Sequence, residues 1–129
     1  REVELPALKR AMAVAAECIG HPVPCIMGGN TFPILDDILS TGTNYLACNV
    51  ETNQAAFVER VARTHPHIKM RVNLDPAVVA CPEPERIYRG IDRVLEIVGG
   101  RPNCVMGTGA MPFETPLENI RLIKEYVAN

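Results

Sequence analysis

The chain has 129 residues, of which 47% are hydrophobic and 22% charged, and its formal net charge is −2 at pH 7. These values are typical of one globular domain, and no basic stripe predicts a nucleic-acid or membrane partner. No apolar run reaches the ~18 residues of a membrane span, and the charged first residues do not form a signal peptide. Five cysteines without a CxxC pair predict buried thiols in a reduced, cytoplasmic protein.

Helical and extended patterns alternate along the chain. Apolar residues recur at helical spacing over 3–19, and Gly20 with Pro22 ends that helix. Four strand-and-helix pairs are expected to follow. The predicted strands are 23–27, 45–48, 68–72 and 104–106. The predicted helices are 32–40, 53–64, 84–98 and one that starts in a capping box at 115–118. This order predicts an α/β protein whose parallel sheet has right-handed crossovers. An open doubly wound sheet and part of an eight-stranded barrel both fit the pattern.

The segments after the predicted strands contain polar residues and glycines. In a barrel, the carboxyl ends of the strands form the active-site rim. The candidates for a catalytic role are Asn49, Glu51 and Asp75. The candidates for substrate binding are Met27, Gly28, Asn30, Asn73, Gly107, Gly109 and Met111. The alternative interpretation is structural, because asparagine, aspartate and glycine favour turns and a loop glutamate is usually solvated.

Four segments resemble the uroporphyrinogen decarboxylase (URO-D) superfamily, in the family's order and at close to its spacing. They are GGNTFPILDD at 28–37, VNLDP at 72–76, VMGTG at 105–109 and ETPLEN at 114–119. The resemblance implies four βα units with a parallel sheet, half of a TIM (β/α)8 barrel, preceded by one helix. Such barrels usually need ~250 residues. We therefore expect residues 1–129 to be a fragment, the C-terminal half of a longer chain that does not begin at Arg1.

The resemblance implies one of two chemistries. The first is decarboxylation of the acetate arms of uroporphyrinogen III, a lyase reaction of porphyrin biosynthesis that uses no cofactor. The second is methyl transfer with a corrinoid partner, usually with a zinc ion that activates a thiol. The zinc ligands of that branch correspond to Ile26, Gly28 and Gly109, which cannot bind metal, so no metal site is expected. The catalytic aspartate and the substrate-binding arginines belong to the missing N-terminal half-barrel, so the chain alone should be inactive.

Three functions remain open at this point. We favour the C-terminal segment of a uroporphyrinogen decarboxylase-like enzyme with a tetrapyrrole substrate. The first alternative is a corrinoid-dependent methyltransferase without the usual zinc ligands, acting on a small methyl donor. The second is a non-catalytic half-barrel that binds a ligand or dimerises. Four parallel strands would leave two open edges, so a protein of only these residues is expected to form homo-oligomers.

Overall fold

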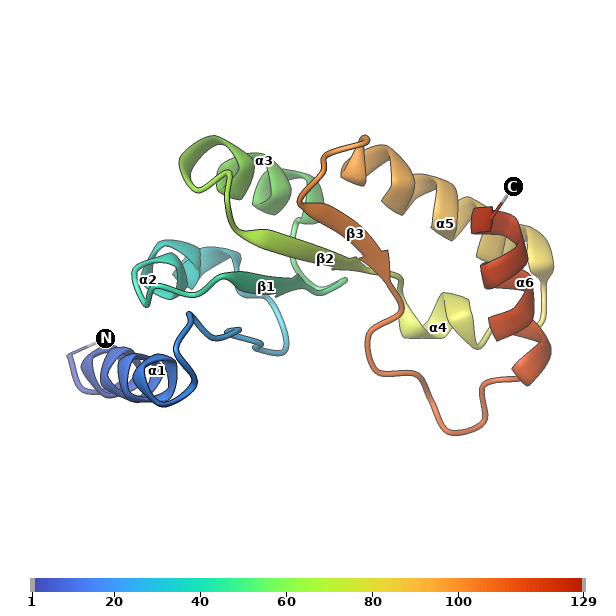
Figure 1. Cartoon of the computed structure of the whole chain (residues 1–129). Coiled ribbons are helices and arrows are strands. Elements are labelled where there is room, and N and C mark those ends of the chain that lie inside the picture. Colours follow the sequence, from blue (N-terminus) through green and yellow to red (C-terminus); the bar gives the residue numbers. More distant parts are fainter. Residues whose placement is uncertain (1, 129) are drawn as a thin grey trace.

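A sheet of three parallel strands is the centre of the computed structural model, which describes residues 2–128 (Figure 1). The strands β1 (Tyr45–Cys48), β2 (Lys69–Asn73) and β3 (Cys104–Gly107) lie side by side in chain order. Helices connect them, as parallel neighbours require. The register places Ala47, Arg71 and Val105 in one row, and Asn73 opposite Gly107. The predicted parallel α/β architecture is therefore confirmed.

The first predicted strand, 23–27, is reduced to one parallel bridge between Cys25 and Leu46. On both sides of this bridge, hydrogen bonds from side chains replace backbone hydrogen bonds that a regular strand pair would make. The Thr43 hydroxyl accepts from the Cys25 N–H at 2.9 Å and donates to the Val23 carbonyl at 3.0 Å. Two residues further on, the Met27 carbonyl accepts from the Asn49 amide at 2.7 Å instead of from a backbone N–H. Within residues 2–128, three of the four expected strands are thus formed.

The helices follow the predicted pattern with three differences. Their bounds are α1 (Glu4–Ile19), η1 (Phe32–Ile34), α2 (Leu35–Leu39), α3 (Gln54–Thr64), α4 (Pro76–Val79), α5 (Pro84–Val98) and α6 (Leu117–Ala128). The expected helix 32–40 is divided into a 3₁₀ turn and a short helix, and α4 was expected to be loop. The capping box at 115–118 is not formed, because the Thr115 hydroxyl donates to the Pro112 carbonyl at 2.7 Å and α6 begins only at Leu117.

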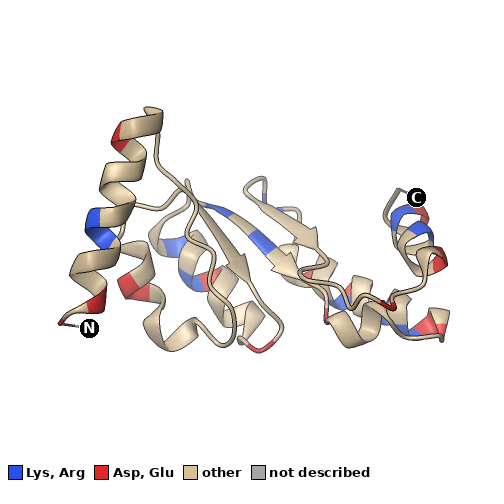
Figure 2. Cartoon of the chain, turned by 90° about the horizontal axis from the view of Figure 1, so that it is seen from below, with Lys and Arg blue, Asp and Glu red and all other residues tan. Residues whose placement is uncertain are grey.

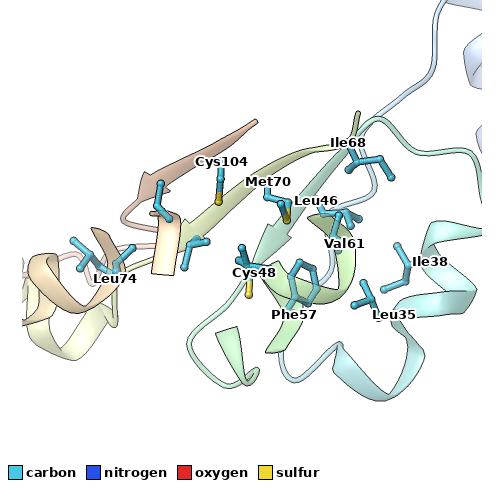
Figure 3. Packing of buried hydrophobic residues seen from close by; sticks show 14 of the residues in the cluster. Leu35, Ile38, Leu46, Cys48, Phe57, Val61, Ile68, Met70, Leu74 and Cys104 are labelled. Atoms are coloured by element: carbon cyan, nitrogen blue, oxygen red, sulfur yellow. The ribbon is translucent and has the colours of Figure 1, made fainter. Parts of the chain in front are cut away.

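The hydrophobic core lies on one face of the sheet, under α3 and α5 (Figure 3). Leu46, Met70 and Cys104 project from the strands on the side of the sheet where Phe57 and Val61 of α3 lie, and all five are buried. Alternate residues of a strand point to opposite faces. The row of Ala47, Arg71 and Val105 therefore belongs to the other face, which we call the inner face. This face is exposed at β3, where Val105 is 53% exposed, whereas Ala47 of β1 is only 4% exposed.

Helix α1 lies at the β1 end of the molecule (Figure 1). None of its residues is fully buried, but Leu8 and Met12 pack partly buried against the core. Its apolar residues Leu5 and Leu8 face Ile34 and Ile38 across a pocket of about 340 Å³. The side chain of Met27 also lines this pocket. Met27 thus packs between α1 and α2, while its backbone lies at the end of the bridged segment.

Candidate functional site

A pocket of about 200 Å³ lies at the carboxyl ends of the strands. Its walls come from 28–29, 49–51, 73–74 with Pro76, and 109–110. These four segments follow Cys25 of the bridge, β1, β2 and β3 in turn. The parallel sheet brings them together because all of its strands end at the same edge. We call this pocket the rim pocket.

Five of the ten residues expected at a binding or catalytic site line the rim pocket. They are Gly28, Asn49, Glu51, Asn73 and Gly109. Glu51 is exposed and is the one carboxylate residue among those that line the pocket. The signal that identified them was their position directly after a predicted strand.

The other five expected site residues lie outside the lining of the rim pocket. Met27 faces the pocket between α1 and α2, and Met111 is 45% exposed in the loop after β3. Asn30 closes a local turn, since its Oδ1 accepts from the Phe32 N–H at 3.2 Å. Asp75 caps α4, because its carboxylate accepts from the Ala77 N–H at 2.8 Å. Turn and cap chemistry therefore accounts for both.

Gly107, the last of these five, lies beneath the pocket on β3. A Cβ atom at this residue would stand 2.5 Å from Cδ of Arg71, so only glycine lets the arginine stem cross the strand. Gly109 has φ +64°, a left-handed conformation that favours glycine. A Cβ at Gly109 would lie 3.2 Å from Nδ2 of Asn73. The glycines of this turn thus let the β3 backbone approach the polar side chains of β2.

Two asparagines form a hydrogen-bonded relay in the wall of the rim pocket. Asn49 donates through Nδ2 to the Met27 carbonyl at 2.7 Å, and Asn73 donates through Nδ2 to Oδ1 of Asn49 at 3.0 Å. A carbonyl only accepts, so the first bond fixes the orientation of both amides. Oδ1 of Asn73 has no hydrogen-bond partner, and it is buried in a residue that is only 5% exposed.

A comparison with protein-family models matches "Uroporphyrinogen decarboxylase (URO-D)" over residues 1–129. The chain belongs to the uroporphyrinogen decarboxylase family. A search of the curated proteins finds no match. The resemblance that four short segments indicated is therefore confirmed for the chain as a whole.

The three positions that the resemblance assigned to the ligands of the zinc branch lie at or near the rim pocket. Gly28 and Gly109 line it, and Ile26 is 61% exposed in the bridged segment. Among residues 2–128, no group of three or more histidine, cysteine or acidic residues could hold a metal ion. No helix of the same residues is long and apolar enough to cross a membrane.

The cysteines of this URO-D family member are five free thiols, of which only Cys18 is exposed. Burial raises the pKa of Cys48 to about 12 and also raises the pKa values of Cys25 and Cys104. A thiol must lose its proton to act as a nucleophile or metal ligand. These three buried cysteines therefore remain protonated and contribute to packing in the hydrophobic core.

Gln54 supports the site and was missed by the sequence analysis. It is 3% exposed at the start of α3, and its Nε2 donates to the carbonyls of Asn73 at 2.8 Å and Cys48 at 3.3 Å. Arg93 of α5 donates to its Oε1 at 2.8 Å. Gln54 thus ties the ends of β1 and β2 together beneath the relay. No local pattern distinguishes such a glutamine from one on the surface, since its partners lie on other elements.

Thr52 is a second supporting residue that the sequence analysis missed. Its buried hydroxyl accepts from the Thr31 N–H at 3.1 Å and lies 3.3 Å from the Gly29 carbonyl, to which it donates. These bonds hold the glycine turn of 28–29 against the loop after β1. A side chain from the neighbouring loop therefore fixes the position of this wall of the rim pocket.

Proposed function

We propose that this chain is the C-terminal half of a (β/α)8 barrel enzyme that decarboxylates the acetate arms of uroporphyrinogen III. One observation carries the proposal within a chain of the URO-D family. The segments after the bridge and the three strands open into one pocket at the carboxyl ends of the sheet. That edge is where (β/α)8 barrels hold their substrates.

The exposed β3 side of the inner face supports the half-barrel proposal. In a closed barrel this face would be covered by strands of the other half, whereas here Val105 is 53% exposed. We propose that the N-terminal half-barrel precedes Arg1 in the same polypeptide. If residues 1–129 are expressed alone, the open edges of the sheet favour association between copies of the chain.

The rim pocket offers this half of the enzyme mainly neutral groups that orient a substrate. Asn49 and Asn73 supply amide donors and acceptors, and the glycines at 28 and 109 let a ligand approach the backbone. Glu51 alone among the lining residues can carry a proton to or from a substrate carbon. We therefore propose binding roles for the amides and glycines, and a secondary proton-transfer role for Glu51. The principal acid belongs to the other half, as the family implies.

The test is an anaerobic assay of the whole gene product with uroporphyrinogen III, which follows the loss of carboxyl groups to coproporphyrinogen III. We expect turnover by the whole protein and none by residues 1–129 alone. Glu51→Gln should lower kcat, while Glu59→Gln on the outer side of α3 is the matched control. Absence of turnover, with methyl transfer from methylcobalamin to a thiol in its place, would assign the protein to the methyltransferase branch. If the protein catalyses neither reaction, the remaining alternative is a non-catalytic half-barrel that binds a ligand or dimerises.

A further inference from the structure

The segment between β3 and α6 presents a fully exposed aromatic side chain. Residues 110–116, which we call the arm, follow β3 and descend below α4 before the chain rises into α6 (Figure 1). Phe113 is 100% exposed and Met111 is 45% exposed. Phenylalanine is among the residue types that are most often fully buried. No side chain of residues 2–128 covers this ring, so its cover must come from outside them.

A hydrogen-bonded turn holds Phe113 at the tip of the arm. The Pro112 carbonyl accepts from the backbone N–H of Thr115 at 3.1 Å and from the hydroxyl of the same residue at 2.7 Å. Phe113 and Glu114 are the two central residues of this turn. Beyond the turn, the side chain of Asn119 fastens the start of α6. A fixed backbone therefore presents the ring, so that little conformational freedom is lost when the ring meets a partner.

The arm begins in the wall of the rim pocket. Gly109 and Ala110 line this pocket, and Phe113 follows three residues later, a stretch of chain that spans at most about 10 Å. The pocket volume of about 200 Å³ is below the roughly 300–1,000 Å³ of typical ligand sites. A ligand of usual size therefore extends beyond the described walls. On the β3 side, the arm is the next segment of the chain that it can contact.

The side chains of the arm are mostly apolar. Glu114 is the one charged residue among residues 108–116, and the coil between β3 and α6 is almost entirely tan in Figure 2. The rim pocket supplies the amides of Asn49 and Asn73, whereas the arm supplies Met111 and Phe113. A thioether and an aromatic ring pack well against flat apolar surfaces. The arm thus complements the faces of a ring system rather than its charged substituents.

We propose that the arm completes the substrate wall on the β3 side of the rim pocket, and that Phe113 packs against the ring faces of a bound tetrapyrrole. This inference rests on the proposed function, which supplies the tetrapyrrole. It deepens that proposal because it names a substrate-binding residue that the sequence analysis did not select. Phe113 does not directly follow a strand, so the signal that identified the other residues did not apply to it.

Phe113→Ala in the whole gene product tests the contact with the substrate. KM for uroporphyrinogen III should rise about tenfold with kcat nearly unchanged, because the contact is equally strong in the ground state and the transition state. Phe113→Tyr keeps the ring and should leave KM within about twofold of the unmodified value. Leu95→Ala on α5, where the side chain is 39% exposed, is the matched control and should leave KM unchanged. Because Phe113 is fully exposed, its replacement should not change Tm, so a change in KM reports binding.

Limited proteolysis with chymotrypsin gives a second measurement that needs no turnover. This protease cleaves after exposed aromatic residues, and mass spectrometry should identify a cut after Phe113 in the free protein. Uroporphyrinogen III or methylcobalamin at ten times its Kd should slow this cut about tenfold, because only the unbound fraction remains accessible. Hydrolysis of a reference peptide under the same conditions shows that the ligand does not inhibit the protease.

The proposal is overturned if neither ligand slows the cut after Phe113, or if Phe113→Ala decarboxylates with an unchanged KM. Resistance to cleavage in the free protein would overturn it as well, since the other half-barrel or a second copy of the chain then covers the ring. These outcomes are separate from the proposed function. Normal decarboxylation without protection removes the role of the arm alone, and protection by methylcobalamin without decarboxylation removes the proposed chemistry alone.

Discussion

Asn119 fastens α6 to the end of α4 and to the loop that follows it, and replacing it with aspartate tests this attachment. The residue is 8% exposed, and its Nδ2 donates to the carbonyls of Val79 at 2.8 Å and Cys81 at 2.9 Å. Asn119→Asp keeps the shape of the side chain, but in either rotamer it places a carboxylate oxygen against the two buried carbonyls. Both donors are lost without a cavity.

The expected cost follows from these two bonds. Each lost hydrogen bond removes about 1 kcal/mol, and leaving buried carbonyls unsatisfied beside a negative charge adds about 1–3 kcal/mol. The free energy of unfolding at pH 7 should therefore fall by about 3–5 kcal/mol. For a chain of this length that is a drop in Tm of roughly 10–20 °C.

The cost should depend on pH with a definite sign. Burial and the two carbonyls disfavour the ionised form, so the pKa of the introduced carboxyl is higher in the folded chain than in the unfolded one. A protonated carboxyl can donate one hydrogen bond. The penalty should thus be smallest below the unfolded pKa of about 3.9 and should grow as the pH rises through the folded pKa.

Thermal unfolding followed by circular dichroism between pH 4 and 8 measures this effect. Asn30→Asp is the matched control, because there the oxygen makes the bond to the Phe32 N–H and aspartate retains it. The control should change the unfolding free energy by less than about 0.5 kcal/mol. If Asn119→Asp matches the unmodified chain at pH 7, or loses equal stability at both ends of the pH range, the two hydrogen bonds of Asn119 do not hold α6 as described.

Three further changes test other parts of the structure. Asp75→Ala should lower the unfolding free energy by about 1 kcal/mol through loss of the α4 cap, while Asp75→Asn should retain most of it in a urea titration; equal losses would refute the cap. A thiol reagent at pH 8 should modify Cys18 at once and Cys48 only on unfolding, since Cys48 is buried with a pKa of about 12; rapid labelling of both would contradict this burial. Gly107→Ala should cost about 1–3 kcal/mol because its methyl group collides with the arginine stem, whereas Gly28→Ala faces open space and should be nearly neutral; urea unfolding compares the two.

Much of the fold could be predicted because its signals are local. Four apolar residues after Asn44 predicted β1, and Pro84 with Gly99 marked the ends of α5, so the bounds of both elements are correct. The convergence of segments at the rim followed from parallel strand order alone. Five candidate residues in the rim pocket were located by this reasoning.

The differences arise from contacts between residues that are distant in the chain. The Thr43 hydroxyl and the Asn49 amide replace the ladder of the segment 23–27, and only the assembled structure places them there. The burial of Gln54 likewise depends on carbonyls at the ends of two strands. Asn119 belonged to a segment that resembled the family, but its bonds to the α4–α5 segment became visible only after folding.

If substrate binds at the carboxyl ends of the strands, a map of NMR chemical-shift changes in the whole protein with uroporphyrinogen III should locate it there. With the residues of this chain labelled by ¹⁵N, anaerobic titration should shift the amides of 28–29, 49–51, 73–75 and 107–110. The amides at the opposite ends of the strands, in 43–45, 67–69 and at 101 and 103, serve as the internal control. Shifts confined to those opposite ends, or saturable binding that leaves the rim unchanged, would show that substrate does not bind at the carboxyl ends of the strands.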